Sequence, residues 1–352
     1  MNEPVPTVGV VVPIHGDYAQ RYLAACCESL AAQAGLRCRV VVVIVHNGVT
    51  PAQSRVIEQM APEAVHLRTL TNLGWTGANN FALRDARARG WEYALLLNAD
   101  ARLDRHCLRT LLQAAQQHPR IAVWQPTILL HATGAINSLG NRIHYLGFGY
   151  CADYGKADTG QPPATVDFVS GACMLVRCDM LRRVGRFRQE YFMYYDDVEF
   201  CWRARLAGYQ LGIARQAVCY HDHRFRIDPQ RMYYAERNRW LTLLTVMRWR
   251  TLLVLGPGLL AAQGVLSGYL LWRGWGGVLR DLWRFFSRRR TWRRLAARRR
   301  WIARIRTQDD ADVMRRFAGV IACEAIPSRA LRYVLNPLAC CYWGLVRRLI
   351  AW

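Results

Sequence analysis

Two runs of β-branched residues near the start of the chain place the strongest constraint on its fold. They are residues 7–13 (TVGVVVP) and residues 39–45 (RVVVVIV). Near-continuous apolar runs of this kind are typical of strands that are covered on both faces of a sheet. Residues 18–33, between the two runs, carry apolar side chains at helical spacing. A strand–helix–strand order predicts parallel strands with helices packed on the sheet.

The same alternation continues through the first two thirds of the chain. We expect further strands at residues 65–70, 93–97, 121–126, 166–176 and 210–219, and helices at residues 51–60, 77–89, 104–117 and 196–206. Glycines and aromatic residues replace the periodic pattern from about 134 to 163, where we expect loops and short strands. The prediction is an α/β fold with a mostly parallel sheet flanked by helices. Ligands of such sheets bind beyond the carboxyl ends of the strands.

The composition changes after residue 240, so we divide the chain into residues 1–240 and 241–352. The first part holds 27 of the 48 basic and 20 of the 25 acidic residues, which leaves a net charge of about +16 on the second. Residues 251–272 contain no charged side chain and are long enough to cross a bilayer. Three interpretations stay open for this segment: a transmembrane span, an interfacial helix and a buried helical hairpin.

Residues 283–306 interleave tryptophan and phenylalanine with clustered arginines. Such a segment can bind nucleic acid, but its aromatic content suits anionic lipid headgroups better. We therefore expect a C-terminal helical, membrane-associated region that binds an anionic membrane surface, and no nucleic acid. The first residues lack a basic stretch followed by an apolar one, and the cysteines show no C-x-x-C spacing. We expect no secretory leader and a reduced, cytoplasmic setting.

A polar segment directly follows the expected strand 93–97. It contains Asn98 and Asp100, and Asp104 comes shortly after. A carboxylate at this end of a parallel sheet can hold a divalent ion against a diphosphate. The alternative is a strand followed by an ordinary helix cap, which is the role we expect for Asp104.

A second acidic segment begins the expected helix 196–206. Asp196, Asp197 and Glu199 follow an aromatic run that starts at Tyr191. Acidic residues are favoured at a helix N-terminus by the helix dipole alone. Paired carboxylates beside aromatic side chains also suit a sugar pocket with a general base, because each carboxylate perturbs the pKa of the other.

Two further segments follow expected strands. Residues 72–80 (NLGWTGANN) combine small residues and amides, which permit close approach of a phosphate to the backbone and to a helix N-terminus. A turn and a cap would explain the same residues. His221 and His223 flank Asp222 after the last strand, and they are candidates for metal or phosphate contact or for ordinary structural roles.

Taken in order, these segments resemble the family 2 glycosyltransferases, and most closely the bacterial rhamnosyltransferase-like branch. The resemblance covers about residues 7–240. Its most specific part is an ordered series of motifs: Val169-Ser170-Gly171-Ala172, Arg177, Val184-Gly185, Phe192-Met193-Tyr194, Asp196-Asp197-Val198-Glu199, Arg203, Gly208-Tyr209 and His221. The resemblance implies a nucleotide-sugar-binding domain of the GT-A type and an inverting sugar transfer that depends on Mg²⁺ or Mn²⁺.

The resemblance also implies roles for single residues. Asp100 matches the last acid of the family's metal-binding motif, with Asn98 at its first position, and His221 matches a histidine that helps hold the metal or the diphosphate. Asp197 matches the catalytic base and Asp196 its acidic neighbour. The remaining matches are expected to bind the donor: Pro13, His46, Asn72, Gly77, Asn80 and Gly171.

The sequence departs from the family pattern at two places. His46 stands where an aspartate usually contacts the nucleotide base, and the motif that begins at Pro13 lacks its asparagine. An imidazole can still hydrogen-bond to a base or stack on it, so we keep His46 among the donor-binding residues. The identity of the base is left open.

The expected partners are a nucleotide-diphosphate-sugar donor, with rhamnose as one candidate sugar, and a saccharide or polyprenyl-linked acceptor of cell-surface polysaccharide or lipopolysaccharide synthesis. The expected location is the cytoplasmic face of the inner membrane, where the protein is peripheral or monotopic. A processive polysaccharide synthase is the alternative, because residues 236–240 (ERNRW) resemble the Q-x-x-R-W signature of those enzymes, with Glu236 replacing the glutamine. A basic nucleic-acid-binding protein is the alternative from another class.

Overall fold

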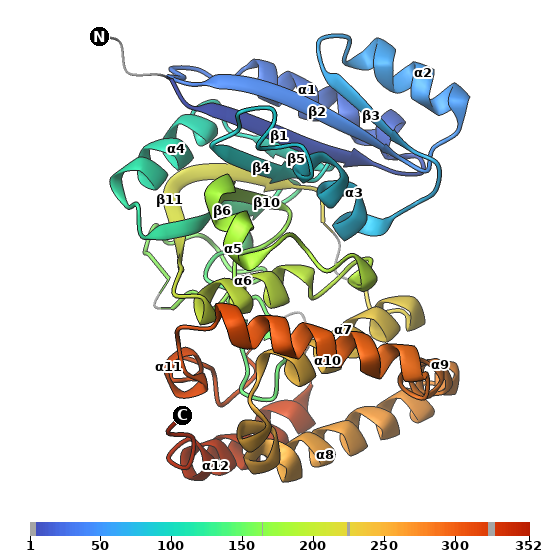
Figure 1. The fold of residues 1–352 in the computed structure, drawn as a ribbon, viewed down its shortest axis with the longest axis vertical. Helices are drawn as coiled ribbons and strands as arrows, with labels where there is room; N and C mark the ends of the chain where they lie inside the picture. Colours follow the sequence, from blue (N-terminus) through green and yellow to red (C-terminus); the bar gives the residue numbers. More distant parts are fainter. Residues whose placement is uncertain (1–4, 164, 224–225, 323–327) are drawn as a thin grey trace.

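A nine-stranded mixed sheet occupies one end of the molecule and a layer of helices the other (Figure 1). The computed structural model describes residues 5–163, 165–223, 226–322 and 328–352. The strand order is β3-β2-β1-β4-β10-β6-β11-β5, with β7 paired to β6. The strands of this sheet are β1 (Thr7–Ile14), β2 (Arg39–Asn47), β3 (Val65–Thr69), β4 (Tyr93–Leu97), β5 (Ala101–Leu103), β6 (Ile121–Leu130), β7 (Ile136–Ser138), β10 (Cys173–Arg177) and β11 (Gln210–His221).

The first four strands are parallel, as their apolar runs predict. Val10 of β1 is in register with Val42 of β2 on one side and with Leu95 of β4 on the other. β6 and β11 run in this same direction, whereas β10, β5 and β7 are antiparallel to their neighbours. The prediction of a mostly parallel α/β sheet is therefore confirmed for the strands that carry the site, and the whole sheet is mixed.

The position of β10 explains its antiparallel direction. β6 ends at the carboxyl edge of the sheet, and the chain stays near that edge through β7 and a small hairpin of β8 (Arg142–Ile143) and β9 (Gly149–Tyr150). β10 then starts beside the end of β4, with Cys173 opposite Leu97. The described residues between β6 and β10 contain no helix that returns the chain to the other edge, so β10 runs backwards. It is also shorter than the strand expected at residues 166–176.

Several helices cover the sheet, and one of them shows how local chemistry favours a helix start. α2 (Pro51–Met60) has proline in its first turn and a reciprocal cap between Thr50 and Gln53. The others are the π-helical turn η1 (Ala19–Leu23), α1 (Ala24–Ala31), α3 (Gly74–Leu83), α4 (Cys107–Gln117), η2 (Cys178–Met180), α5 (Leu181–Val184), η3 (Gln189–Tyr191) and α6 (Asp196–Leu206). Asp104 does not cap α4, which begins later; it accepts a hydrogen bond from the backbone of His106 at 3.3 Å.

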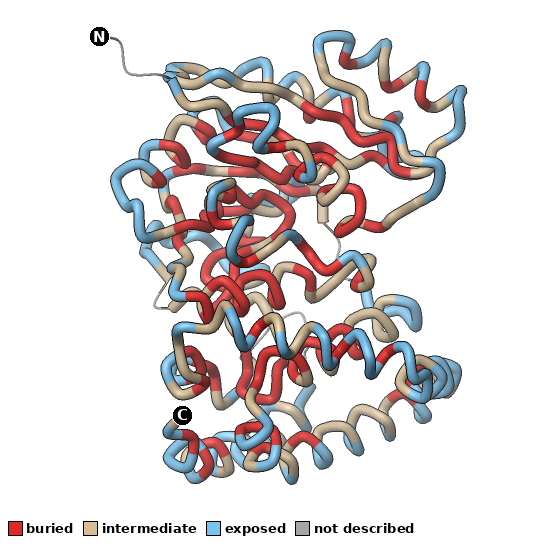
Figure 2. Tube along the Cα trace, viewed as in Figure 1, coloured by how far each residue is buried: buried red, intermediate tan, exposed pale blue. Residues whose placement is uncertain are grey.

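The C-terminal part is helical, as expected. It consists of α7 (Pro229–Val246), α8 (Trp249–Trp272), α9 (Gly276–Phe286), α10 (Arg289–Ile305), α11 (Asp310–Met314), the π-helical turn η4 (Leu331–Leu335) and α12 (Asn336–Val346). The expected boundary at residue 240 lies inside α7. One core cluster joins residues on both sides of it, such as Leu96 with Leu243 and Leu255, and Figure 2 shows buried chain running from the sheet into this layer.

α8 corresponds to the uncharged segment noted in the sequence. Within the described residues it is the one helix long and apolar enough to cross a membrane. Its most apolar stretch is only 22% buried. One side of α8 packs on the protein, however: Gln263 accepts a hydrogen bond from the indole of Trp240 at 2.7 Å, and Tyr342 of α12 donates one to the Val254 carbonyl at 2.8 Å.

Candidate active site

The carboxyl ends of β1, β2 and β4 bring polar side chains together at one edge of the sheet. Each strand is followed by, or ends in, a residue that can contact a ligand: His15 after β1, Asn47 at the end of β2, and Asn98 and Asp100 after β4. Parallel strands end at the same edge, so register alone makes these residues neighbours. The site predicted from the sequence lies here.

Asp100 faces His221 across this edge. The Oδ1 atom of Asp100 lies 3.2 Å from Nε2 of His221, and Oδ1 is buried without a well-aligned hydrogen-bond donor. The Nδ2 atom of Asn98 lies 3.5 Å from the same His221 nitrogen. The other ring nitrogen of His221, Nδ1, is 3.0 Å from Oδ1 of Asn137. The antiparallel pairing of β11 with β5, which sets His221 opposite Ala101, produces this contact.

These residues fit a divalent cation. When Nδ1–H of His221 donates to Asn137, Nε2 presents a lone pair to the carboxylate of Asp100, so two acceptors face one another with a gap suited to a cation. Among the described residues, no group of three or more His, Cys, Asp or Glu side chains converges on one point. Mg²⁺ characteristically takes one or two protein ligands and completes its shell with water and substrate phosphates.

Asp196 and Asp197 begin α6 as expected. Burial raises the pKa of Asp197 to about 6, although backbone N–H groups of Val198 and Gly171 donate to its carboxylate at 2.8 and 3.4 Å and oppose the rise. Burial, and then the charge of Asp197, raise the pKa of Asp196 well above its usual range. Asp197 thus has the basicity of a general base that is ionised at neutral pH.

A strained loop holds this acidic pair in place. Phe192, Tyr194 and Tyr195, which precede Asp196, all have positive φ angles between 62° and 65°. Bulky residues rarely adopt this conformation, and it costs about 1–3 kcal/mol at each position. Such a conformation persists only when contacts with the surrounding structure hold it in place.

α7 supplies those contacts. The buried side-chain amide of Asn238 donates to the carbonyls of Tyr191, Met193 and Tyr194 at 3.0, 2.9 and 2.8 Å. Arg237 donates to the Tyr191 carbonyl at 2.9 Å. The sequence did not identify Asn238, because an amide in a helix gives no local signal of a bond to a distant loop.

Trp75 joins the two halves of the site. Its indole nitrogen donates to Oδ1 of Asn98 at 2.8 Å, and its ring packs so closely on Gly171 that a Cβ there would approach it to 2.9 Å. Gly171 in turn donates its N–H to Asp197. Gly171 is therefore placed between the Asp100 side and the Asp197 side, and its role in donor binding stays a prediction. Trp75 lies in the loop 72–80 but was not singled out there.

The donor loop is organised around Asn72. Its Oδ1 accepts from the Asn47 amide at 2.9 Å and from the Gly74 N–H at 2.8 Å, and its Nδ2 lies 3.0 Å from Nε2 of His15. His15 is exposed and its Nδ1 lies 3.0 Å from the Asn47 carbonyl. Pro13 is half-buried within β1, two residues before His15 of this cluster.

His46 does not offer its ring to a ligand. It is 1% exposed, with Nδ1 at 2.8 Å from the Ser54 hydroxyl and Nε2 at 2.9 Å from Nδ1 of His66. Burial, followed by the neighbouring His66, lowers its pKa to about 4, so the ring is neutral. The expectation that His46 hydrogen-bonds to a base is therefore wrong: both of its nitrogens point into the packing between β2, β3 and α2. The exposed His15 occupies the accessible position instead.

Gly77 and Asn80 are also engaged in contacts within the protein. α3 begins at Gly74, three residues before the helix expected from the sequence, so both positions lie inside the helix. Gly77 is buried against Leu73 and Gln189, and the amide of Asn80 exchanges two hydrogen bonds with the backbone of Phe187, at 2.8 and 3.0 Å. Their role is to attach α3 to the loop before α6, so we leave them out of the donor site.

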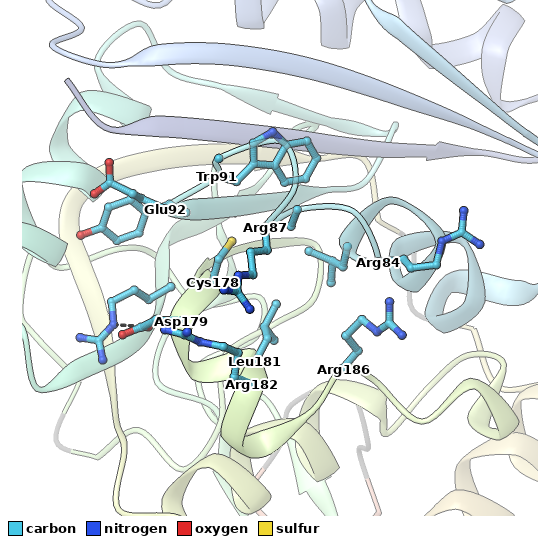
Figure 3. Close-up of a pocket in the computed structure, with 14 residues that line it drawn as sticks. Arg84, Arg87, Trp91, Glu92, Cys178, Asp179, Leu181, Arg182 and Arg186 are labelled. Atoms are coloured by element: carbon cyan, nitrogen blue, oxygen red, sulfur yellow. Dashed lines mark hydrogen bonds and ion pairs between the residues drawn. The ribbon is translucent and has the colours of Figure 1, made fainter. Parts of the chain in front are cut away.

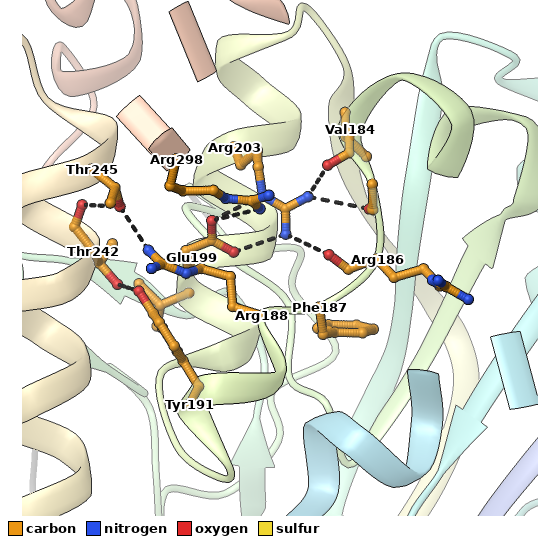
Figure 4. A network of polar contacts seen from close by, with 12 residues as sticks. Val184, Arg186, Phe187, Arg188, Tyr191, Glu199, Arg203, Thr242, Thr245 and Arg298 are labelled. Atoms are coloured by element: carbon orange, nitrogen blue, oxygen red, sulfur yellow. Dashed lines mark hydrogen bonds and ion pairs between the residues drawn. The ribbon is translucent and has the colours of Figure 1, made fainter. Parts of the chain in front are cut away.

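A buried ion pair anchors the helix that carries Asp197. Glu199 and Arg203 of α6 form two hydrogen bonds of 2.9 and 2.8 Å, and Arg298 of α10 approaches Glu199 to 3.5 Å (Figure 4). Arg203 also donates to the carbonyls of Gly185 and Arg186 at 3.2 and 3.1 Å. Burial alone would raise the pKa of Glu199, but the two arginines lower it to about 2.

A separate hollow of about 610 Å³ lies at the opposite edge of the sheet (Figure 3). It is lined by the start of β4 and the residues after β10, including Trp91, Tyr93 and Cys178, and by the arginines Arg87 and Arg186. None of the described residues that line it belongs to the predicted site. The polar side chains of the candidate site therefore lie at the other edge of the sheet, around Asp100.

Known proteins have sequences related to this chain. The low-salt glycan biosynthesis hexosyltransferase Agl10 of Haloferax volcanii is 29% identical over 182 residues, which is 48% of this chain and 57% of the relative. The N-acetylglucosaminyl-diphospho-decaprenol L-rhamnosyltransferase of Mycobacterium tuberculosis is 27% identical over 230 residues, which is 59% of this chain and 73% of that enzyme. The chain thus matches only a little over half the length of the first relative.

Solved structures show the same fold at low sequence identity. GalNAc-T7, crystallised with UDP, GalNAc and Mn²⁺, has a TM-score of 0.54 and 10% identity and covers 70% of this chain and 49% of its own. The mannosyltransferase PcManGT of Pyrobaculum calidifontis, in complex with GDP-Man and Mn²⁺, has a TM-score of 0.50 and 16% identity and covers 85% and 86%. Both confirm the GT-A-like fold.

The family model described as "Glycosyltransferase like family 2" matches residues 6–242, which is about two thirds of the chain. The matched segment ends in α7, just after the residues that hold the loop before Asp196. It therefore contains every residue of the candidate site. The chain belongs to the family 2 glycosyltransferases.

Proposed function

We propose that this glycosyltransferase inverts the anomeric carbon of the sugar it transfers, and that Asp197 is its base. The observation that carries this is the position of Asp197, which is partly exposed at the start of α6 and is linked to the Asp100 side through Gly171 and Trp75. The rise of its pKa to about 6 supports the role of a base. In the proposed reaction, Asp197 takes the proton of an acceptor hydroxyl. The hydroxyl oxygen attacks the anomeric carbon from the face opposite the diphosphate, and the bond to the nucleoside diphosphate breaks.

Asp100 and His221 are proposed to hold Mg²⁺ or Mn²⁺, which when bound would neutralise negative charge on the diphosphate. Burial and the charge of Asp197 favour the protonated form of Asp196. Asp196 therefore adds little negative charge beside Asp197. Asn98 is fixed by Trp75 and directs its Nδ2 toward His221. These residues orient the leaving group while Asp197 acts on the acceptor.

The donor is proposed to be a nucleotide-diphosphate-sugar, with its nucleotide over the ends of β1 and β2. His15, Asn47 and Asn72 form one hydrogen-bonded cluster there, and Pro13 leads into it. The related sequences are a hexosyltransferase and a rhamnosyltransferase, so rhamnose and a hexose are the two sugar candidates.

The acceptor is proposed to be a saccharide or a polyprenyl-linked saccharide in the synthesis of a cell-surface glycan, used at the cytoplasmic face of a membrane. One relative's name specifies a diphospho-decaprenol-linked acceptor. We propose single additions of sugar. Glu236, at the position of the synthase-like glutamine, makes an ion pair with Arg239 at 2.6 Å and 3% exposure, so it is a structural residue in α7.

A donor panel tests the function. We would measure thermal stability and transfer with UDP-, GDP- and dTDP-linked sugars, with and without Mn²⁺, because a ligand that binds only the folded state stabilises it. We expect one nucleotide class to raise the melting temperature in a metal-dependent way and to support transfer with inverted configuration, read by NMR of the product. Retained configuration, or long products from a single enzyme encounter, would contradict the proposal.

A further inference from the structure

The exposed side of α8 is a continuous apolar face. Reading along the helix, the exposed positions recur every three or four residues, as they must to lie on one face. α8 is described in full, and Arg250 in its first turn is its one exposed charged residue. From Leu253 onward the exposed positions are all uncharged: Leu253, Pro257, Leu260, Ala261, Gly264, Val265, Gly268, Leu271 and Trp272. Leu253, Leu260 and Trp272 are 77%, 73% and 80% exposed. Soluble surfaces carry scattered apolar residues but seldom an uncharged face over about five turns.

A second apolar element lies at the same end of the molecule. η4 and α12 expose Tyr333, Val334, Leu338 and Leu345, and Leu349 follows them. α12 is fastened to α8 by the Tyr342–Val254 hydrogen bond, and Trp352 donates to Thr251 at 3.0 Å. Figure 1 places both helices at the end farthest from β2 and β3.

Arginines surround this apolar surface. Exposed guanidinium groups lie at both ends of α8, before and within η4 and just after α12: Arg250, Arg273, Arg329, Arg332, Arg347 and Arg348. In the described part of the chain none of these six forms a salt bridge. An apolar face with exposed indoles at its two ends and unpaired cations at its border complements the boundary between acyl chains and anionic headgroups.

We propose that α8 and η4–α12 together dock on an anionic lipid bilayer, with α8 lying in the plane of the membrane. An in-plane position follows from the other side of α8. Gln263 receives the Trp240 indole and lies 3.3 Å from Arg239, whose guanidinium is buried with Glu236. A spanning α8 would have to abandon these contacts and expose a buried ion pair. This inference does not depend on the proposed reaction, because vesicle binding needs neither donor nor acceptor.

Flotation of the full chain with preformed vesicles tests the proposal. We would compare phosphatidylcholine vesicles with vesicles that contain 30% phosphatidylglycerol, and the wild type with the double variant Leu253→Glu/Leu260→Glu. Leu70→Glu is the matched control, because Leu70 is a fully exposed leucine beside β3 at the opposite end of the molecule. We expect strong binding to the anionic vesicles and a loss of about tenfold or more in the double variant only.

Three outcomes would overturn the proposal. One is an absence of binding to anionic vesicles; another is equal binding by the wild type and the double variant. The third is a concentration-dependent dimer in light scattering that the double variant abolishes, because a second copy would then cover this face. An unchanged melting temperature of the double variant, whose substituted side chains are exposed, establishes that lost binding is not lost folding. Preformed vesicles also separate in-plane docking from insertion, since a spanning helix requires integration during membrane assembly or detergent.

Discussion

The imidazole Nε2 of His221 lies 3.2 Å from the carboxylate Oδ1 of Asp100, at the junction of the last strand with the short strand that follows β4. When Nδ1–H of His221 donates to Asn137, the contact pairs two potential metal ligands rather than a donor with an acceptor. A cation between the two side chains would then be needed to complete the site, and neither side chain supplies it.

Metal-dependent donor binding should require this pair. We expect Asp100→Asn and His221→Ala each to weaken Mn²⁺-dependent binding of a nucleoside diphosphate by about 10- to 100-fold, the usual effect of disturbing a metal site. Isothermal calorimetry with and without Mn²⁺ measures this. His66→Ala is the control, since the His66 ring hydrogen-bonds to His46 and to the Ala61 carbonyl, away from Asp100 and His221. Unchanged metal-dependent binding in both site variants would contradict the assignment.

Asp197→Asn should keep donor binding and lose about 10²- to 10⁴-fold in turnover, which is the usual contribution of a general base. Because the pKa of Asp197 is raised to about 6, the wild-type kcat/KM should fall about tenfold per pH unit below pH 6 and level off above it. A pH–rate profile and donor titrations of both proteins measure these effects. A base role for Asp197 would be untenable if the variant turned over like the wild type.

Asn238→Ala should disturb catalysis through the strained loop. Loss of three hydrogen bonds to carbonyls before Asp196 lets the loop relax and weakens the contact between Gly171 and Asp197. A displacement of about 1 Å in an active site can cost about 10²-fold in rate. We expect a lower kcat and an upward shift of the acid limb of the pH profile, because the Gly171 N–H holds the pKa of Asp197 down.

Asn336→Ala is the matched control for this variant. Asn336 also uses both ends of its amide, at 2.9 Å each, to hold the backbone of Ile321, far from the site. We expect it to lower the melting temperature and leave the pH profile unchanged. If Asn238→Ala behaved in the same way, Asn238 would be a structural residue and not a positioning one.

The Glu199–Arg203 pair should be a large contributor to stability. Glu199→Gln leaves the buried guanidinium of Arg203 without its counter-charge, and breaking such a pair costs about 3–5 kcal/mol of unfolding free energy. Arg298→Met should cost much less, because Nε of Arg298 is buried without a partner. Urea denaturation compares the two variants. Equal losses would show that Arg298 is as important as Arg203 for holding α6.

The His46–His66 contact should make stability depend on pH. The pKa of His46 falls from its ordinary 6.5 to about 4 on folding, so the unfolded chain binds the extra proton between these values. Stability should therefore be complete above pH 6.5 and decrease as the pH falls toward 4. Between pH 6.5 and 4, the unfolding free energy of His46→Gln should fall by about 1–3 kcal/mol less than that of the wild type. Thermal melts at pH 4.5 and 7.5 check it; an identical slope would refute the contribution.

Local pattern was enough to predict most of the sheet and the acidic motifs. The runs that became β1, β2 and β4 are apolar without interruption, which fits strands covered on both faces of a sheet. The starts of α2 and α6 follow from a proline in the first turn and from a cluster of acids, respectively. Asp100 and His221 were identified because polar residues at the ends of apolar strands stand out from their surroundings, and Asp197 because a cluster of acids begins an expected helix.

Other assignments depended on contacts between distant segments. His46 follows a strand as Asn98 does, and only the packing of Ser54 and His66 around its ring distinguishes a buried histidine from a ligand. Asn80 is drawn to Phe187, and Asn238 to the loop before Asp196, by hydrogen bonds that span long separations in the chain. No periodicity reports such bonds.

The sequence by itself therefore determined the strand–helix order, the parallel half of the sheet and the family, because these depend on burial patterns and on ordered motifs. The tertiary structure decided which polar side chains remain available, the direction of β10, and the orientation of α8. An uncharged helix can span, lie flat or be buried with the same composition. Its contacts with Trp240 and Tyr342 cover one side and leave the other exposed, and that asymmetry exists only in the folded chain.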